Sequence, residues 1–428
     1  MIKKIAIQVL VFSFLFLNFN NVYAQPSILC ETAVLIDANT GTILAEKNAD
    51  QKMYPASLTK IMTAILVIEM GDLSDVITVD DDTPYEIEGS HIALEPGEIL
   101  TLKDLLYALM LPSANDAALV IAKHYGGSSE EFVKLMNEKA EELGAYNTHF
   151  ANPHGLHDDD HYTTAADLAL ITKYAMTNEI FRKIVSTEKY EIQPTNKKTE
   201  TRYFTNLNKL IYNTSASQIL VDGAYISPFY QYATGAKTGY TPQAGNCLIA
   251  TATKDGTDLI AVAMKGVSLE MYQDAQNLFN YGFSEYESTT LISKNTFVKN
   301  VKIKNGDSKE ISVITESDLN TLLKKDSLET IKSNVIIDEF DLPLEKNQVI
   351  GKIEFTLDNE LLGSVNLITP IEVTSTLEEN SGGNFFMGVL KFLGILLIFS
   401  VVALFLLKIY NDIRLKLNRK KRRKRYNN

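Results

Sequence analysis

The sequence contains only two cysteines, no internal repeat and an excess of acidic over basic residues. Two cysteines permit at most one disulfide, and the lack of a repeat argues against a repeat-array fold. The formal charge of −12 at pH 7 argues against nucleic acid as a partner of the acidic main part of the chain. A hydrophobic content of 45% and a charged content of 22% are those of a globular protein, and 428 residues predict more than one domain.

Long apolar runs are also scarce, and the first of them lies near the N-terminus. Lys3 and Lys4 precede the apolar run Ile5–Leu17, and a short segment of mostly small residues ends at Ala24. This pattern is typical of a signal peptide that is cleaved after Ala24. We therefore expect the protein to be exported.

The other long apolar run is Phe385–Leu407, interrupted only by Lys391 and Ser400. As a helix it would extend about 34 Å, which exceeds the roughly 30 Å of a bilayer core. Residues 408–428 hold ten Lys or Arg and one Asp, and the positive-inside rule places such a tail in the cytoplasm. A nucleic-acid patch is the alternative for this tail, but its position beside an apolar span argues against it. The sequence thus predicts a single-pass protein of the cell membrane with its main part outside.

The chain between these ends divides into two parts and a polar linker. Strands lie at both ends of the first part with helical runs between them, and short alternating runs typical of strands fill the second. The predicted fold class is mixed α/β (α+β), with an antiparallel sheet flanked by helices. We predict this organisation: signal peptide, 1–24; α/β part, 25–288; small all-β domain, 294–374; linker, 375–384; transmembrane helix, 385–407; basic tail, 408–428.

The tetrapeptide Ser57-Leu58-Thr59-Lys60 lies at the predicted start of a helix. It precedes Ile61–Met70, an almost wholly apolar run that is long enough for a buried helix. Residues three apart share a helix face, so Lys60 should lie beside Ser57. A neutral lysine can activate a serine hydroxyl, and burial or a nearby second cation favours the neutral form. Alternatively, Ser57 is an ordinary first-turn residue and Lys60 is solvated.

Ser113 and Asn115 lie between two predicted helices, Leu102–Leu111 and Ala117–His124. A serine at this place is most often the N-cap of the second helix. The functional alternative is that its hydroxyl faces Lys60 and relays protons, while Asn115 binds a substrate amide carbonyl.

The tripeptide Lys237-Thr238-Gly239 lies on a predicted strand, ahead of a hairpin. An Asp-Gly pair between the apolar runs Asn246–Thr253 and Asp258–Met264 is a strong hairpin signal. Gly239 would let a substrate strand approach this edge closely, with its carboxylate held by Lys237 and Thr238. Lys and Thr on an edge strand otherwise discourage aggregation.

Together, an S-x-x-K, an S-x-N and a K-T-G in this order match the motif set of class A β-lactamases and penicillin-binding proteins. The chain resembles the low-molecular-mass penicillin-binding proteins of the penicillin-binding protein 5-like family, which are serine-type D-alanyl-D-alanine carboxypeptidases. The resemblance covers residues 28–285, and 342–351 resembles their all-β C-terminal domain. The stretches that carry it are Pro55–Thr63, Ser113–Ala118, Phe150–Leu156, His161–Ala169 and Gly235–Thr241.

This resemblance implies an enzyme that removes the terminal D-Ala from peptidoglycan stem pentapeptides through an acyl-enzyme, and that β-lactams inhibit by acylation. It implies an oxyanion hole made by the backbone N–H groups of Ser57 and Tyr240. No metal and no cofactor are implied. The implied catalytic residues are Ser57, Lys60 and Ser113, and the implied substrate-binding residues are Asn115, Lys237, Thr238, Gly239 and Tyr240.

Two positions depart from the family pattern. Tyr240 stands where some members carry His, and Met271 stands where an arginine often precedes a helix. If that arginine helps to hold the substrate carboxylate, Lys237 must do more of this work here.

The segment 154–161 contains three His and three Asp, which could ligate zinc. The segment meets no rule of ligand spacing, and Thr163-Thr164 directly after it is typical of a helix cap. The resemblance makes the segment a loop that borders the site.

The two cysteines, Cys30 and Cys247, are predicted to be free. The sheet order implied by the resemblance separates them by two strand spacings, about 9.6 Å, which exceeds the roughly 7 Å limit for bridged Cα atoms.

Two other functions are open at this point. A β-lactamase shares the motifs, but no deacylating Glu is apparent on a loop, and an all-β domain with a membrane anchor fits that function poorly. A non-catalytic cell-wall-binding scaffold is the other alternative, and the presence of every motif residue argues against it.

Overall fold

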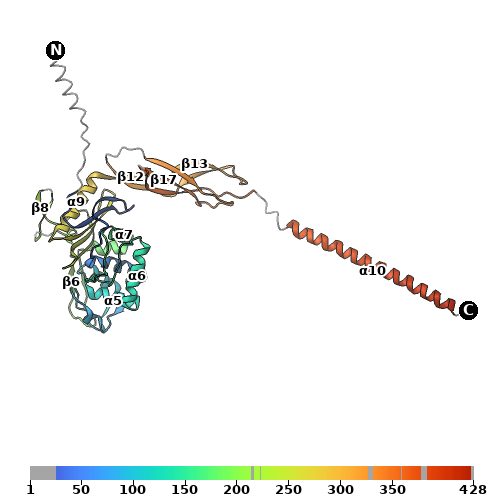
Figure 1. Cartoon of the computed structure of the whole chain (residues 1–428), viewed down its shortest axis with the longest axis horizontal. Helices are drawn as coiled ribbons and strands as arrows, with labels where there is room; N and C mark the ends of the chain where they lie inside the picture. The colour runs from blue at the N-terminus through green and yellow to red at the C-terminus, as the bar shows by residue number, and fades with distance from the viewer. Residues whose placement is uncertain are drawn as a thin grey trace, which may run out of the picture. The chain divides into compact units, whose positions relative to one another are not determined.

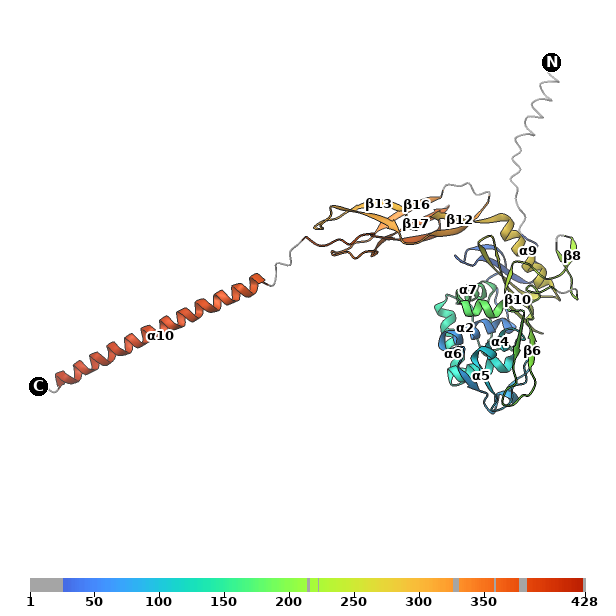
Figure 2. The same cartoon turned by 180° about the vertical axis from the view of Figure 1, so that it is seen from behind.

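The computed structural model describes residues 26–213, 216–221, 223–325, 331–357, 359–376 and 383–425. The predicted signal peptide and most of the predicted linker lie outside these residues. The described chain forms two compact units (Figures 1 and 2). The first runs to Ile292 and includes 319–333 and 355–363, and the second comprises 293–318, 334–354 and the residues from Ser364 onward.

The elements of the first unit follow one another from β1 to β12, with β15 added later in the chain. They are β1 (Thr32–Asp37), β2 (Ile43–Lys47), the 3-10 helix η1 (Ala56–Thr59), α2 (Lys60–Met70), β3 (Val76–Thr78), α3 (Thr83–Glu86), β4 (Ile99–Thr101), α4 (Leu102–Met110), α5 (Asn115–Gly126), α6 (Ser129–Glu142), α7 (Ala165–Ala175), α8 (Glu179–Val185), β5 (Lys189–Ile192), β6 (Arg202–Thr205), β7 (Ile219–Val221), β8 (Ala224–Ile226), β9 (Ala233–Thr241), β10 (Gly245–Lys254), β11 (Thr257–Gly266), α9 (Glu270–Glu285), β12 (Tyr286–Ile292) and β15 (Leu319–Lys324).

A five-stranded sheet in the order β2-β1-β11-β10-β9 organises this unit. The strands are antiparallel, and the predicted hairpin forms as β10 and β11, with Ile249 opposite Val262. β9, the strand of the K-T-G motif, is an edge strand of this sheet. One side of β9 is therefore open to pairing with an extended peptide.

Both faces of the sheet are buried, which explains why β1 is apolar along nearly its whole length. Successive side chains of a strand point to opposite faces. Val34 therefore packs into the cluster formed with α2, α4, α5 and α7, whereas Leu35 packs into the cluster formed with α9. The predicted antiparallel sheet flanked by helices is confirmed, and Figure 2 shows α9 on one side and α2 and α7 on the other.

The second unit contains most of a β-sheet in the order β13-β14-β18-β17-β16, of which short pieces of β16, β17 and β18 fall in the first unit. This sheet confirms the all-β fold expected for this part of the chain. Its strands are β13 (Phe297–Lys302), β14 (Glu310–Thr315), β16 (Lys332–Ile337), β17 (Val349–Leu357) and β18 (Glu360–Ile368). The sequence did not predict β12 and β15, which pair with each other and belong to the first unit.

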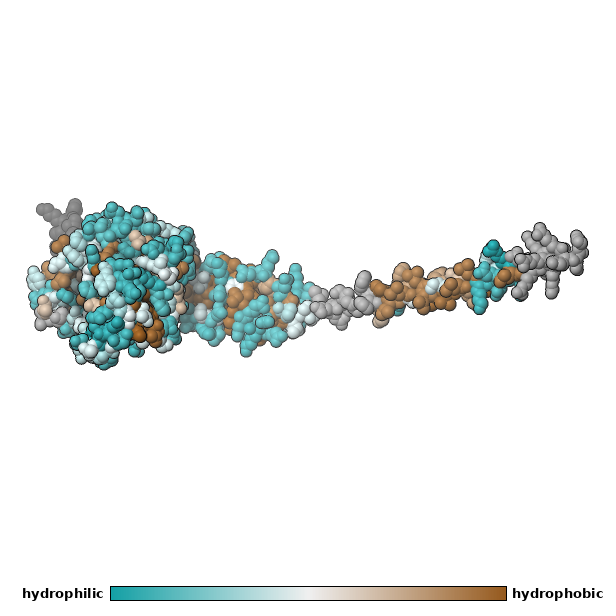
Figure 3. Space-filling view, turned by 90° about the horizontal axis from the view of Figure 1, so that it is seen from below, coloured by the Kyte–Doolittle hydropathy of each residue, from teal (hydrophilic) through white to brown (hydrophobic). Residues whose placement is uncertain are grey.

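The last element, α10 (Gly383–Arg425), contains the predicted membrane span and continues into the basic tail. Within it, Met387–Lys416 is long and apolar enough to cross a membrane. Figure 3 shows the apolar surface along this helix, which no other described part of the chain covers.

Cys30 and Cys247 are both free and buried, as predicted. Burial raises the pKa of the Cys247 thiol to about 12 and also raises that of Cys30, where the neighbouring Asp274 adds to the effect. Both thiols are therefore protonated and unreactive at neutral pH.

Candidate active site

The first turn of the η1–α2 segment places Ser57 and Lys60 side by side. Lys60 is fully buried, Ser57 is half-buried, and the Lys60 Nζ lies 3.1 Å from the Ser57 Oγ. The residue before the serine, Ala56, has a φ of 48°, which non-glycine residues seldom adopt. The apolar run that follows buries nine residues of α2 and holds this strained turn in the interior.

The surroundings of Lys60 favour a neutral amine. Its Nζ donates to the Asn115 Oδ1 at 2.7 Å and to the backbone oxygen of His154 at 2.6 Å. Both oxygens can only accept, so when the amine is neutral its two N–H bonds can serve them and its lone pair is left for the Ser57 hydroxyl. Burial, and secondarily the positive charge of Lys237, lowers the pKa of Lys60 well below its usual value, while Asp116 acts in the opposite direction.

Ser113 lies in the link between α4 and α5 and is not an N-cap. The N-cap of α5 is Ala114, which makes no side-chain cap, whereas Thr101 and Thr164 cap α4 and α7 with their hydroxyls. Ser113 has a φ of 64° and is 4% exposed, and its Oγ is one of four buried side-chain polar atoms in the described chain that lack a hydrogen-bond partner. A strained residue with an unpartnered buried hydroxyl is a candidate functional position.

Asn115 is held from both ends of its amide. Its Oδ1 accepts from Lys60, and its Nδ2 donates to the backbone oxygen of Glu88 at 2.7 Å. One N–H bond of the Nδ2 remains for a ligand carbonyl.

β9 brings the third motif to the same place. Gly239 lies so close to the turn that carries Ser57 that a Cβ built on it would be 3.0 Å from the Ser57 nitrogen. Lys237 is 1% exposed, and its Nζ donates to the backbone oxygen of Thr238 at 3.0 Å. Burial lowers the pKa of Lys237 to about 7. Tyr240, on the same strand, is 63% exposed.

The structure therefore brings together most of the residues that the sequence singled out. Hydrogen bonds join Ser57, Lys60 and Asn115, and Gly239 packs against the turn that carries Ser57. Thr238 and Tyr240 flank them on β9. The sequence missed the backbone oxygen of His154, because a carbonyl acceptor has no side-chain signature. The one feature of the sequence that could have pointed to this loop is the neighbouring glycine, Gly155. The structure explains this glycine, because a Cβ on it would lie 1.9 Å from the Ala56 oxygen.

The histidines of the segment 154–161 do not form a metal site. His161 is buried between Thr59 and Ala151, and no group of three or more His, Cys, Asp or Glu in the described part of the chain could hold a metal ion.

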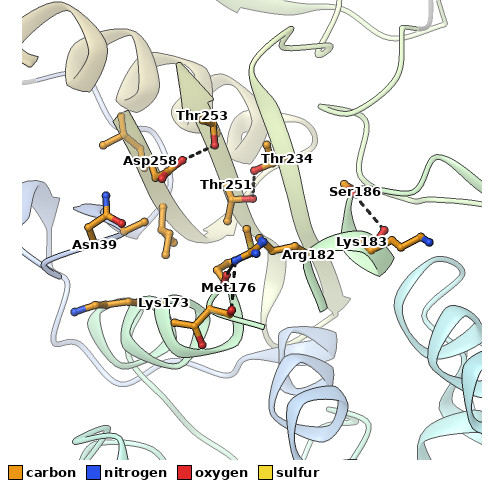
Figure 4. Close-up of a pocket in the computed structure, with 15 residues that line it drawn as sticks. Asn39, Lys173, Met176, Arg182, Lys183, Ser186, Thr234, Thr251, Thr253 and Asp258 are labelled. Carbon is orange, nitrogen blue, oxygen red and sulfur yellow. Dashed lines mark hydrogen bonds between the residues drawn. The ribbon is translucent and has the colours of Figure 1, made fainter. Parts of the chain in front are cut away.

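A pocket of about 500 Å³ lies toward the start of β9, away from the motif residues (Figure 4). Figure 4 shows Arg182 reaching the backbone of Met176, where it donates at 2.7 Å to the backbone oxygen. Lys173 similarly donates to the backbone oxygen of Thr40 at 2.9 Å. These cations tie loops together, and none of the residues expected to act in the site lines this pocket.

Comparison with known proteins gives two family matches. Residues 20–268 match the model described as D-alanyl-D-alanine carboxypeptidase, and residues 286–375 match the one described as penicillin-binding protein 5, C-terminal domain. The chain is 36% identical over 342 residues to the D-alanyl-D-alanine carboxypeptidase DacF of Bacillus subtilis (strain 168), which covers 78% of this chain and 82% of the relative. It is 30% identical to DacA of Escherichia coli (strain K12), over 86% of this chain and 88% of the relative.

Solved structures show the same likeness. Penicillin-binding protein 5 from Haemophilus influenzae aligns with a TM-score of 0.66 and 28% identity, over 82% of this chain and 99% of that structure. A variant of the Streptomyces K15 DD-transpeptidase aligns with a TM-score of 0.55 and 32% identity, over 61% of this chain and 100% of that structure.

Proposed function

Because the chain belongs to the D-alanyl-D-alanine carboxypeptidase family and is a serine-type hydrolase, we propose that it removes the terminal D-Ala of peptidoglycan stem peptides through an acyl-enzyme on Ser57. The observation that carries this proposal is the contact of the Lys60 Nζ with the Ser57 Oγ, together with the two oxygens that fix the amine in an orientation suited to a base.

Acylation would begin when the Ser57 Oγ attacks the carbonyl carbon of the penultimate D-Ala. Lys60 takes the proton of the hydroxyl as the general base. The backbone N–H groups of Ser57 and Tyr240 stabilise the negative oxygen of the tetrahedral intermediate. The unpartnered Ser113 hydroxyl passes a proton to the leaving amine of the terminal D-Ala. Water then hydrolyses the ester and frees Ser57.

The substrate would lie along the open edge of β9. Lys237 and Thr238 bind its terminal carboxylate, and Asn115 binds an amide carbonyl with its remaining N–H bond. With Met271 in place of an arginine, Lys237 is the principal cationic anchor. A β-lactam presents a similar acyl group, but its amine stays attached after the ring opens, which favours a long-lived acyl-enzyme.

Labelled penicillin tests the nucleophile. Intact-mass spectrometry should find one label on the wild type and none on Ser57→Ala, while the wild type releases D-alanine from a pentapeptide. An equally labelled Ser57→Ala protein would contradict the assignment. Hydrolysis of the β-lactam without D-alanine release would favour a β-lactamase, and labelling with neither activity would favour a wall-binding scaffold.

The location is part of the same proposal. A cleaved signal peptide and one spanning segment within Met387–Lys416 would place the enzyme outside the cell and the basic tail inside. A protein truncated to residues 25–378 should then be soluble and active. Protease treatment of intact cells without an outer barrier should digest the catalytic part, and digestion of the tail alone would reverse the topology.

A further inference from the structure

We propose that His161 and Thr59 are positioning residues that orient the Ser57 N–H of the oxyanion hole. This inference rests on the proposed function. It concerns a hydrogen-bond chain that begins on the loop before α7 and ends on the peptide group of the nucleophile.

His161 is 1% exposed, and both of its ring nitrogens have partners. The backbone N–H of Ala151 donates to its Nδ1 at 3.0 Å, and its Nε2 lies 2.7 Å from the Thr59 Oγ1. Since the Nδ1 accepts, the proton of the neutral ring must lie on the Nε2, which donates to Thr59. Burial lowers the pKa of His161 to about 4, against the opposing charge of Asp158, so the ring is neutral at neutral pH.

The Thr59 hydroxyl extends this series of hydrogen bonds by donating to the backbone oxygen of Ala56 at 2.8 Å. A threonine that donates to a carbonyl one turn earlier is common in helices, and Thr172 does so toward Leu168 at 2.7 Å. Thr59 differs because a buried histidine also donates to its oxygen. Its hydroxyl therefore has one orientation, and the two hydrogen bonds polarise one another.

The Ala56 carbonyl and the Ser57 N–H belong to the same peptide group. In a trans peptide the two bonds point in opposite directions, so fixing the oxygen fixes the N–H. Gly155 encloses the same oxygen, while Gly239 lies beside the Ser57 nitrogen on the other side. The φ of 48° at Ala56 makes this peptide strained, and the chain from His161 offsets the strain where the N–H must be aimed.

The test compares Thr59→Val with Thr172→Val in the full-length protein. Both replace a fully buried threonine hydroxyl that donates to a helix carbonyl, but only Thr59 receives a hydrogen bond from His161. Acylation by penicillin should slow about tenfold or more in Thr59→Val and less than twofold in Thr172→Val, with similar melting temperatures. Thr59→Ser should acylate at the wild-type rate. His161→Gln should do so too, because its amide can both accept from Ala151 and donate to Thr59, whereas His161→Leu should be slowed like Thr59→Val.

An infrared spectrum separates positioning from a general structural effect. With a penicillin labelled with ¹³C at the reacting carbonyl, the ester band of the acyl-enzyme should move to higher wavenumber in Thr59→Val and His161→Leu, because the ester oxygen loses hydrogen bonding. The band should stay in place in Thr172→Val and His161→Gln. If Thr59→Val acylates like the wild type and its band does not move, the positioning role is wrong while the function stands. A wild type that penicillin does not label on Ser57 overturns both.

Discussion

Two sides of the site each present a buried lysine, and the two lysines are built differently. On the helical side, the Lys60 Nζ has three oxygen neighbours, in Ser57, Asn115 and His154. On the strand side, the Lys237 Nζ has a single acceptor in the described chain, the backbone oxygen of Thr238. No ion pair joins either lysine to a carboxylate within the described residues. The protein thus supplies all the hydrogen-bond partners that the Lys60 Nζ needs, but it leaves N–H donors of the Lys237 Nζ available for a ligand.

The difference between the surroundings of the two lysines matches the roles proposed for them, Lys60 as the base and Lys237 as the anchor of the substrate carboxylate. A base needs its lone pair aimed at one hydroxyl, which fixed oxygens provide. An anchor needs free N–H donors in a dry place, where a charge-assisted hydrogen bond is strong. Burial lowers the pKa of both lysines, and the charge of Lys237 acts in the same direction on Lys60.

The largest effect is expected from removing Lys60, the proposed base. Lys60→Ala should slow acylation by penicillin by roughly 10² to 10⁴-fold, because general-base catalysis typically contributes that much. Lys60→Arg should be as inactive, since a guanidinium keeps its proton at any working pH. Time-resolved intact-mass spectrometry measures the rate. If Lys60→Arg acylated at the wild-type rate, Lys60 would contribute a positive charge and would not act as a base through its lone pair.

Removing the anchor should have a smaller and more selective effect. Lys237→Ala should lower kcat/KM for a peptide with a free terminal carboxylate about ten- to a hundredfold, the cost of one charge-assisted hydrogen bond of about 1.5–3 kcal/mol. The C-terminal amide of the same peptide should lose far less. Kinetics on the two peptides decide the point, and equal losses would remove Lys237 from the anchor role.

The pH dependence of the wild type should reveal the titration of Lys237. Burial lowers the pKa of Lys237 to about 7, so the free enzyme holds the cation below that pH and loses it above. Above pH 7, kcat/KM for the free-carboxylate peptide should therefore fall by about tenfold per pH unit. The amide should not show this fall, and neither should Lys237→Ala with either peptide. If the wild type showed the same dependence of kcat/KM on pH for the free-carboxylate peptide and for the amide, the anchor role of Lys237 would be contradicted.

The smallest effect concerns stability. Ser113→Ala removes a buried hydroxyl that has no partner, so the free energy of unfolding should stay the same or rise by up to about 1 kcal/mol. Thr172→Val removes a satisfied hydroxyl and should lower it by about 1 kcal/mol. Thermal unfolding compares the two. Equal destabilisation would mean that the Ser113 hydroxyl supports the fold.

The sequence predicted the main sheet well, and it singled out residues that the structure brings together, because the signals of both are local. The apolar run after Lys60, the Asp-Gly turn between β10 and β11, and Thr164 as a helix cap each lie within a few residues of the feature that they specify. The link between His161 and Thr59 spans 102 residues and leaves no periodic trace. For the same reason the pairing of β12 with β15 was missed, since no turn signal joins the two strands.

The open edge of β9 also exposes the protein to pairing with a second copy of itself. Most sheets protect such edges with outward charges, but the lysine of this strand is turned inward, and a ligand needs the backbone groups uncovered. Two copies that paired edge to edge through β9 would block each other's active sites. The uncovered edge that admits a peptide is thus also the edge at which self-association would compete with the substrate.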